Sequence, residues 1–220
     1  MLTLALDAST YEGSVAIVAG DRVLAERDVA MRGERAERLM PAVAAALDSA
    51  GASVGDVERM VCGAGPGSFT SLRIAGSIAK GIALGRGVPL YAVPSLLLIV
   101  ASSSRTETGG RFLAVLDAMR GDVFAAGYKV RADGGFDELA AVTVIPRSEV
   151  GRMASSLSAR PIGPQEPLRA IPHARGVARL MPWMDEGRMV DLAQWEPDYG
   201  RLAEAQVRWE AAHGRALPRV

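Results

Sequence analysis

Apolar runs bounded by turn residues open the chain and predict the start of a sheet. Residues 2–6 form a short apolar run that predicts a buried strand. Residues 14–19 and 22–28 predict two more strands, and Gly20-Asp21 between them is typical of a tight turn. The chain is therefore expected to begin with three consecutive strands.

A helical pattern comes after these strands. The segment 34–50 carries apolar residues at helical spacing from Leu39 to Leu47, and Gly51 closes it. Pro41 lies inside the pattern. Because proline lacks an N–H group and its ring crowds the preceding turn, Pro41 should either start the regular helix or kink it.

A glycine-rich turn, Gly63-Ala64-Gly65-Pro66-Gly67-Ser68, joins a predicted strand at 58–62 to a second helix. Ser68 is well placed to cap that helix, whose free N–H groups and partial positive charge favour an anion. A Walker A loop would need Gly-Lys-Ser/Thr at its end, and a dinucleotide fingerprint would need an acidic residue about 20 positions later. Nucleotide binding and a plain strand-to-helix turn both remain open.

The second helix, which runs through Gly85, is apolar over much of its surface. A helix of this kind should be covered on more than one side. One side would contact the sheet, and the other would contact either the helix at 34–50 or a second subunit. The two neighbouring stripes consist of Ile74, Ile78 and Ile82 and of Ala75, Ala79 and Ala83, with Gly76 close by.

The pattern strand-strand-strand-helix then occurs a second time. A strand at 88–93, a helix at 94–102 and a polar linker at 102–110 come first. The run Leu113-Ala114-Val115-Leu116-Asp117-Ala118 then repeats Leu4-Ala5-Leu6-Asp7-Ala8. Further strands are predicted at 122–130 and 139–145, with a helix at 146–157. A repeat of this length is a fold-level signal that outweighs any single short motif.

The repeat predicts an α/β fold of two duplicated actin-like lobes (the ASKHA, ribonuclease H-like class, βββαβαβα), with the second lobe reduced. Residues 1–103 would form the first lobe and residues 104–220 the second lobe with a C-terminal tail. In that architecture a nucleotide lies between the lobes, and the aspartate of the first strand meets phosphate and metal. Asp7 is then either such a ligand or a cap for the turn after its strand.

The last part of the chain is irregular in pattern. Four prolines between 161 and 172 discourage regular structure up to a helix-like stretch from Ala174. Residues 181–184 predict a local packing cluster, and residues 196–206 lead into an amphipathic helix that ends near 212. The tail is expected to be partly mobile or docked elsewhere.

Composition narrows the function classes. The chain has 220 residues, 49% of them apolar, with 25 basic and 25 acidic residues, so no overall field favours nucleic acid or an anionic membrane. Cys62 is the single cysteine, which excludes an internal disulfide and fits a reducing cytosol. With no secretory signal and no apolar run near the ~20 residues of a membrane helix, a cytoplasmic protein is expected.

The sequence offers little catalytic chemistry. His173 and His213 lack the carboxylate or cysteine neighbours of a metal site, so no metal is expected. No Gly-x-Ser-x-Gly elbow exists, and Ser68 has no obvious base. The second-lobe turn, Asp117-Ala118-Met119, lacks the glycine that kinases of this architecture carry, and too little chain remains for a full adenosine-binding lobe. We therefore expect no catalytic residues.

Several motifs resemble those of one known family, TsaB, also called YeaZ. The resemblance covers nearly the whole chain and is strongest from 1 to about 130. Its most specific motif is GPGSFT-x-LR. The matching stretches are Leu6–Thr10, Gly65–Arg73, Leu116–Val123 and Pro197–Ala205.

This resemblance implies a non-catalytic subunit of the bacterial machinery that makes threonylcarbamoyladenosine (t6A) in tRNA. It implies a heterodimer with the transferase TsaD through the two first-lobe helices, with the ATPase TsaE in a ternary complex and TsaC supplying the activated threonylcarbamoyl group. The chain alone would form a homodimer, if any, and would reach tRNA only through the complex. No cofactor is required, although ATP or ADP could lie at the partner interface.

The resemblance also implies site residues. The expected partner interface comprises Arg35, Arg38, Leu39, Ala42, Val43, Ala46, Ser71, Leu72, Ala75, Gly76, Ala79 and Lys80. The expected remnant of a nucleotide site comprises Asp7, Ser9, Gly65, Gly67 and Ser68. The chain departs from the family pattern at Ala8, Arg35 and Ser71, where many members carry Thr, His and Gly. The alternatives are a stand-alone actin-like ATPase or small-molecule kinase and a glycoprotease-like peptidase.

Overall fold

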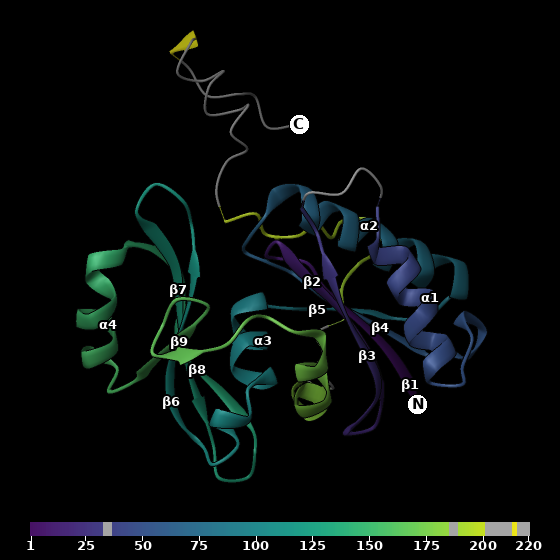
Figure 1. Cartoon of the computed structure of the whole chain (residues 1–220), viewed down its shortest axis with the longest axis horizontal. Helices are drawn as coiled ribbons and strands as arrows, with labels where there is room; N and C mark the ends of the chain where they lie inside the picture. Colours follow the sequence, from purple (N-terminus) through teal and green to yellow (C-terminus); the bar gives the residue numbers. More distant parts are fainter. Residues whose placement is uncertain (33–36, 185–188, 201–212, 215–220) are drawn as a thin grey trace.

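The computed structural model describes residues 1–32, 37–184, 189–200 and 213–214, and it contains two five-stranded sheets (Figure 1). The first sheet has the order β3-β2-β1-β4-β5. Strand β1 pairs with β2 antiparallel and with β4 parallel, so the sheet is mixed. Its strands are β1 (Leu2–Asp7), β2 (Glu12–Ala19), β3 (Arg22–Ala30), β4 (Arg59–Gly63) and β5 (Leu90–Val93).

The second sheet repeats this topology. Its order is β10-β9-β6-β7-β8, and its central strand β6 pairs antiparallel with β7 and parallel with β9. Each strand of the first sheet therefore has a counterpart five positions later in the strand order, which confirms the duplicated fold. The strands are β6 (Gly110–Asp117), β7 (Asp122–Val130), β8 (Phe136–Pro146), β9 (Arg160–Gly163) and β10 (Leu168–Arg169).

The prediction of irregular structure at residues 161–172 was wrong, because β9 and β10 lie there. Pro161 belongs to β9 and stands opposite Leu113 of β6. On its other side β9 pairs with β10 only through Ile162 and Gly163. Pro161 thus has a partner strand on one side, a position at which a missing N–H group is tolerated.

Five α-helices are assigned in the described residues (Figure 1). In Figure 1, α1 and α2 lie over one face of the first sheet, α3 lies between the sheets, and α4 covers the outer face of the second sheet. The helices are α1 (Leu39–Ser49), α2 (Phe69–Arg86), α3 (Ser95–Ser102), α4 (Val150–Ser156) and α5 (Met181–Met184). The 3-10 segments are η1 (Val54–Asp56), η2 (Ser104–Thr106), η3 (Arg147–Glu149) and η4 (Ala174–Leu180).

Helix α1 begins at Leu39, later than the expected start at 34, and residues 33–36 lie outside the described part of the chain. Pro41 occupies the third helical position. The N–H groups of the first turn have no partner inside a helix, so a proline there costs no hydrogen bond. Of the two outcomes expected for Pro41, the structure has the one in which it lies at the helix start.

A single apolar core joins the two lobes. It contains residues of the first sheet such as Val18 and Val61, residues of the second sheet such as Phe112 and Ala126, and helix α3 between them. Segments η4 and α5 add Val177 and Met184 to the same core. The face of the first sheet that α1 and α2 cover forms a separate core.

The polar segment 102–110 is packed more closely than its sequence suggested. Thr106 is fully buried, and its hydroxyl donates to the carbonyl of Val100 at 2.7 Å. The guanidinium of Arg179 donates to Thr106 Oγ1 at 2.9 Å and to the carbonyl of Ala101 at 3.1 Å. The partner that orders this segment comes from η4, far along the chain, so local composition does not reveal it.

Candidate functional site: the glycine turn and the helix pair

The five residues predicted for a nucleotide site do come together. Strands β1 and β4 are parallel neighbours, with Leu6 opposite Cys62, so both strands end at the same edge of the sheet. The turn after β1 and the glycine turn after β4 therefore touch. Ser68 donates its backbone N–H to the carbonyl of Ser9 at 2.7 Å, and this bond joins the two turns.

Asp7 is buried and its carboxylate is used within the chain. Oδ1 accepts hydrogen bonds from the backbone N–H of Ser9 at 3.0 Å and from its hydroxyl at 2.8 Å. Oδ2 accepts from the hydroxyl of Ser95 at 2.6 Å. Burial raises the pKa of the Asp7 carboxyl above its ordinary value, while the bonds from Ser95 and Ser9 act in the opposite direction. The side chain thus caps the turn after β1 and ties it to the start of α3.

The glycine turn is closed over by the chain's own backbone. At Gly67 a Cβ atom would overlap the carbonyl of Ser9, and at Gly65, where φ is +89°, it would overlap the carbonyl of Asp198. Asp198 also donates its N–H to the carbonyl of Ala64 at 2.7 Å. Only glycine allows backbone to approach this closely, so the two glycines serve a contact inside the protein.

Ser68 stands at the N-cap of α2, but its side chain does not cap the helix. Its hydroxyl pairs with the hydroxyl of Ser71 at 3.0 Å instead. The expected capping bond is therefore wrong. Ser71, one of the departures from the family pattern, is buried and engaged within its own helix.

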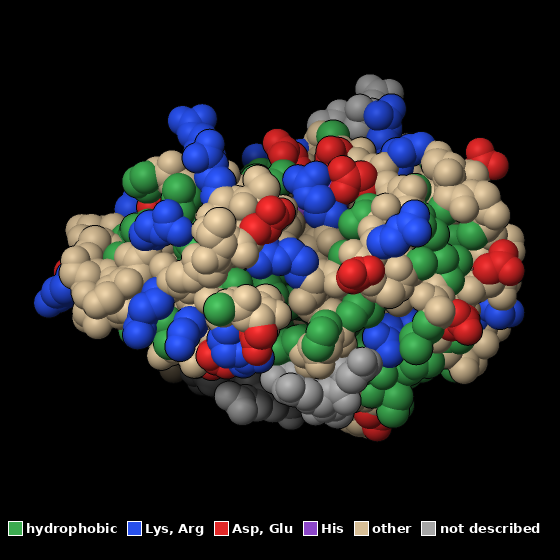
Figure 2. Space-filling model, turned by 90° about the horizontal axis from the view of Figure 1, so that it is seen from below, with side chains coloured by type: hydrophobic (Ala, Val, Ile, Leu, Met, Phe, Trp, Pro, Cys, Tyr) green, Lys and Arg blue, Asp and Glu red, His purple; other side chains and the backbone are tan. Residues whose placement is uncertain are grey.

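Two polar hollows lie where the lobes meet, and neither is lined by the five residues of the predicted nucleotide site. The larger hollow, of about 840 Å³, is lined by residues such as Glu12, Arg105 and Arg169. The other, of about 740 Å³, lies between Asp21 and the β7–β8 turn. On the face drawn in Figure 2, positive and negative side chains are interspersed, so that no large patch of one sign forms.

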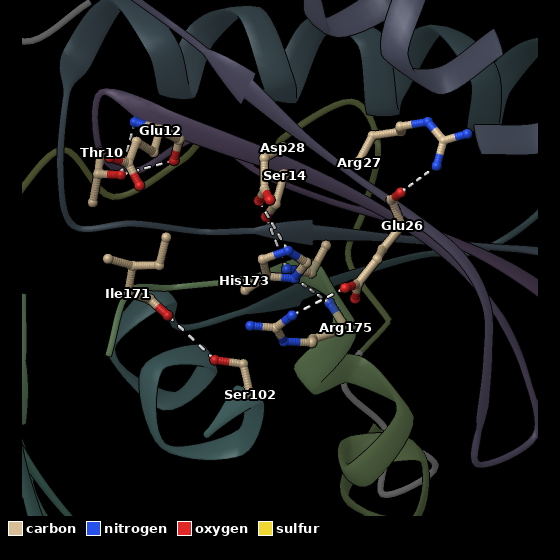
Figure 3. A network of polar contacts seen from close by, with 11 residues as sticks. Thr10, Glu12, Ser14, Glu26, Arg27, Asp28, Ser102, Ile171, His173 and Arg175 are labelled. Atoms are coloured by element: carbon tan, nitrogen blue, oxygen red, sulfur yellow. Dashed lines mark hydrogen bonds and ion pairs between the residues drawn. The ribbon is translucent and has the colours of Figure 1, made fainter. Parts of the chain in front are cut away.

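A polar network beside the larger hollow fixes η4 to the first lobe (Figure 3). The ring of His173 is buried, and its Nδ1 accepts from the backbone N–H of Arg175 at 3.0 Å. Its Nε2 lies 3.1 Å from a carboxylate oxygen of Asp28 in β3. Burial, with the positive charge of Arg175, lowers the pKa of His173. Arg175 itself pairs with Glu26 at 3.0 Å.

Most of the residues expected at a partner interface are buried inside this chain. Leu39, Val43, Ala46, Ala75 and Ala79 pack in the core between the helix pair and the first sheet. Leu72, Ser71 and Gly76 are also buried, Ala42 and Lys80 are half-buried, and Arg38 is exposed. Arg35 lies outside the described residues.

A different set of residues faces outward from the helix pair. The exposed positions of α2, here called the α2 strip, are Thr70, Arg73, Ser77, Gly81 and Leu84. Leu84 is 75% exposed, and a Cβ at Gly81 would meet no atom within 4 Å. On α1, Met40 is 44% exposed, and its neighbours Ala44 and Ala45 are exposed as well. Sequence reasoning missed this strip because it singled out the alanine stripe, although the strip has the same helical spacing on the opposite face.

The segment 189–200, here called the strap, lies along α2 (Figure 1). It pairs with β5 through a bridge between Tyr91 and Met189. Further along, Lys80 donates its ammonium to the carbonyl of Trp195 at 3.0 Å, and the rings of Phe69 and Tyr199 lie 4.5 Å apart. The described part of the tail is thus docked on the first lobe, while the helix expected up to 212 lies outside the described residues.

The duplicated sheets and the glycine turn between β4 and α2 define a two-lobed protein of the actin-like class. The sequence model described as "TsaD: tRNA N6-adenosine threonylcarbamoyltransferase" matches residues 30–154, more than half of the chain. The tRNA threonylcarbamoyladenosine biosynthesis protein TsaB of Escherichia coli is 36% identical over 134 residues. The chain belongs to the TsaB (YeaZ) family.

The matches differ in how much they cover. The E. coli match spans 61% of this chain and 58% of that protein, little more than half of its length. TsaB of Bacillus subtilis is 27% identical over 95% of this chain and 98% of its own. A solved structure from Pseudomonas aeruginosa, described as similar to peptidase YeaZ, has a TM-score of 0.76 at 28% identity and covers 91% of this chain and 99% of its own.

Two negative findings concern the described residues only. Among their helices, none has the combined length and apolar character that crossing a bilayer requires. Within the same residues, no three His, Cys, Asp or Glu side chains are arranged to hold a metal ion.

Proposed function

We propose that this chain is a non-catalytic subunit of the machinery that makes t6A in tRNA, and that it binds and supports the transferase TsaD. Its relatives in E. coli and B. subtilis are named as tRNA threonylcarbamoyladenosine biosynthesis proteins. The match to the TsaD sequence model supports common descent with the transferase itself. In this proposal the chain contributes a binding surface, and the chemistry takes place on TsaD.

The observation that carries the proposal is the state of the phosphate turns. All the acceptor positions of Asp7 that the structure uses are bonded to Ser9 and Ser95. The carbonyls of Ser9 and Asp198 occupy the space beside the glycine turn. A nucleotide between these turns would have to displace several short hydrogen bonds and a stretch of packed backbone, which favours a structural role for the five residues.

The helix pair is the proposed contact for TsaD. The α2 strip and the exposed residues of α1 form a face of small and apolar side chains, including Gly81, Ala44 and Leu84. Small residues let a partner helix approach closely, and an exposed leucine gains from being covered. The buried residues of the predicted interface would then support this face from beneath.

The remaining parts of the assembly belong to the same proposal. TsaE joins the pair in a ternary complex, tRNA is reached through that complex, and ATP or ADP binds, if at all, where the subunits meet. Without TsaD, the helix face would pair with a second copy of the chain.

Light scattering on mixtures with TsaD from the same source tests the partnership. We expect a species with the mass of a heterodimer, and two unassociated species would contradict the proposal. Calorimetry of the isolated chain with Mg-ATP tests the absence of catalysis. Tight binding with turnover would favour the alternative, a stand-alone ATPase or small-molecule kinase.

A further inference from the structure

The strap is held against α2 by contacts along its whole length. Val190 donates its N–H to the carbonyl of Leu90 at 2.9 Å, and Leu192 and Trp195 pack against the core of the first lobe. Pro197 is buried beside Gly76, where a Cβ atom would lie 3.2 Å from the proline ring. The strap is therefore a fixed part of the first lobe's surface.

The position of the strap relative to the α2 strip is decisive. Ile74 and Ile78, half-buried on one side of the strip, belong to the core that α2 shares with α1. Gly76 and Lys80, on the other side, contact the strap. The exposed face of α2 is thus a strip bordered by α1 on one side and by the strap on the other.

The strip alone is too small for a stable interface. Specific protein interfaces bury about 800 Å² per partner, contributed by roughly 20–30 residues on each side. The α2 strip offers only a few exposed side chains, namely Thr70, Arg73, Ser77, Gly81 and Leu84. A partner helix about 10 Å across that packs on this strip must also cover the surfaces beside it. One of those surfaces is α1 and the other is the strap.

The charge of the strap is one-sided. Its twelve residues include three carboxylates, those of Asp191, Glu196 and Asp198, and no lysine or arginine, whereas the whole chain has 25 acidic and 25 basic residues. All three acidic residues are exposed. Asp191 and Asp198 each accept one backbone N–H through a single oxygen, from Ala193 and Gly200. Their remaining carboxylate oxygens face solvent-exposed surface and are available to a partner's donors.

We propose that the strap forms one side of the surface that binds the transferase subunit, and that its carboxylates contact basic side chains of that partner. This inference rests on the proposed function and adds a chemical requirement to it. The partner must present a face of small or apolar residues to the α2 strip and, beside it, lysine or arginine to Asp191, Glu196 and Asp198.

Charge reversal at Glu196 tests the inference with little risk to the fold, because the side chain is exposed. We expect Glu196→Arg to weaken binding of TsaD about tenfold at ~0.05 M salt, chiefly through slower association, since charges at the edge of an interface act mainly on the association rate. The loss should shrink at ~0.5 M salt, where such charges are screened. Glu196→Gln should give a smaller loss in the same direction.

Two further variants separate this inference from the proposed function. Gly81→Arg places a long charged side chain in the middle of the α2 strip and should weaken binding at least a hundredfold if TsaD docks there. Asp21→Arg reverses an equally exposed charge at the β2–β3 turn, away from the helix pair, and serves as the control that should change nothing. Hydrogen exchange of the Asp198 amide, which bonds to Ala64, reports whether the strap stays docked in each variant.

Each outcome decides one of the two ideas. If Gly81→Arg weakens binding and Glu196→Arg matches the Asp21→Arg control, the strap inference is overturned and docking on the helix pair stands. If neither variant weakens binding, both are overturned. If Glu196→Arg changes only the self-association of the isolated chain, the surface belongs to a second copy and the stated partner is wrong.

Discussion

The turn after β1 and the turn after β6 occupy the same place in the two halves of the duplication, yet they are built differently. In the first lobe Asp7 is buried and its carboxylate accepts hydrogen bonds from Ser9 and Ser95. In the second lobe Asp117 is exposed and accepts one bond, from the backbone N–H of Met119 at 3.1 Å. Topology has been retained in both halves, while the surroundings of the equivalent aspartate have not.

The cause of this difference is the segment that comes after the neighbouring parallel strand in each lobe. After β4 the chain makes the glycine turn and the long helix α2, and these close over the first turn. After β9 it goes almost directly into β10, which leaves the second turn uncovered. Met119 is consequently 57% exposed, and both Met119 and Arg120 have left-handed backbone angles, with φ of 66° and 59°.

The largest expected effect comes from removing the two aspartates in turn. Asp7→Ala leaves three buried donors of Ser9 and Ser95 without their acceptor, so we expect a loss of about 3 kcal/mol in the free energy of unfolding. Asp117→Ala removes one exposed bond and should change stability very little. Urea denaturation of both variants measures the contrast. Should Asp7→Ala fail to fold, Asp7→Asn keeps the shape and still loses part of the network. Equal effects at both positions would contradict the comparison.

A second, smaller effect is a pH dependence specific to the first turn. Because burial raises the pKa of Asp7 above 3.8, the folded state keeps the proton over a range in which the unfolded state has released it. The contribution of Asp7 to stability is therefore full below pH 3.8 and is lost as pH rises through the folded-state pKa. The loss proceeds by up to about 1.4 kcal/mol per pH unit.

The matched reference for this pH effect is Asp7→Asn, which cannot titrate. The difference in the free energy of unfolding between the natural chain and Asp7→Asn should decline with rising pH in that window. A difference that stays flat or rises with pH would mean that the bonds from Ser95 and Ser9 outweigh burial.

The smallest effect concerns backbone strain in the second turn. Left-handed angles cost a residue with a side chain about 1 kcal/mol, whereas glycine adopts them freely but loses more chain entropy on folding. Met119→Gly should therefore raise stability by about 0.5 kcal/mol. Ala118→Gly, at the buried neighbouring position, should lower stability and serves as the control. Thermal unfolding by calorimetry would resolve the two signs.

The sequence predicted the fold where the signals were local and repeated. Six strands of the two βββ units, the strand before the glycine turn, and helices α2 and α3 all lie where apolar periodicity placed them. It failed where a distant partner decides. The chain at Pro161 becomes a strand because β6 pairs with it, and Thr106 is ordered by Arg179, which lies 73 positions later.

The candidate site was predictable in part. The motif residues Asp7, Ser9 and Ser68 were expected close together, and parallel pairing of β1 with β4 brings them there. The sequence did not reveal that Asp198 closes the glycine turn, because that contact joins positions more than a hundred residues apart. Residue type alone also does not say which stripe of α2 faces inward, since Ala75 and Gly81 are both small.

The shared core between the sheets has a consequence for synthesis on the ribosome. Segment η4 packs against β1, β2 and β3, and its first residues bond to Ser14 and Asp28, about 150 positions earlier in the chain. One face of the N-terminal sheet therefore stays uncovered until residues 173–184 have left the exit tunnel. During that interval the nascent chain exposes apolar strands, and it should depend on chaperones more than a protein whose halves mature one after the other.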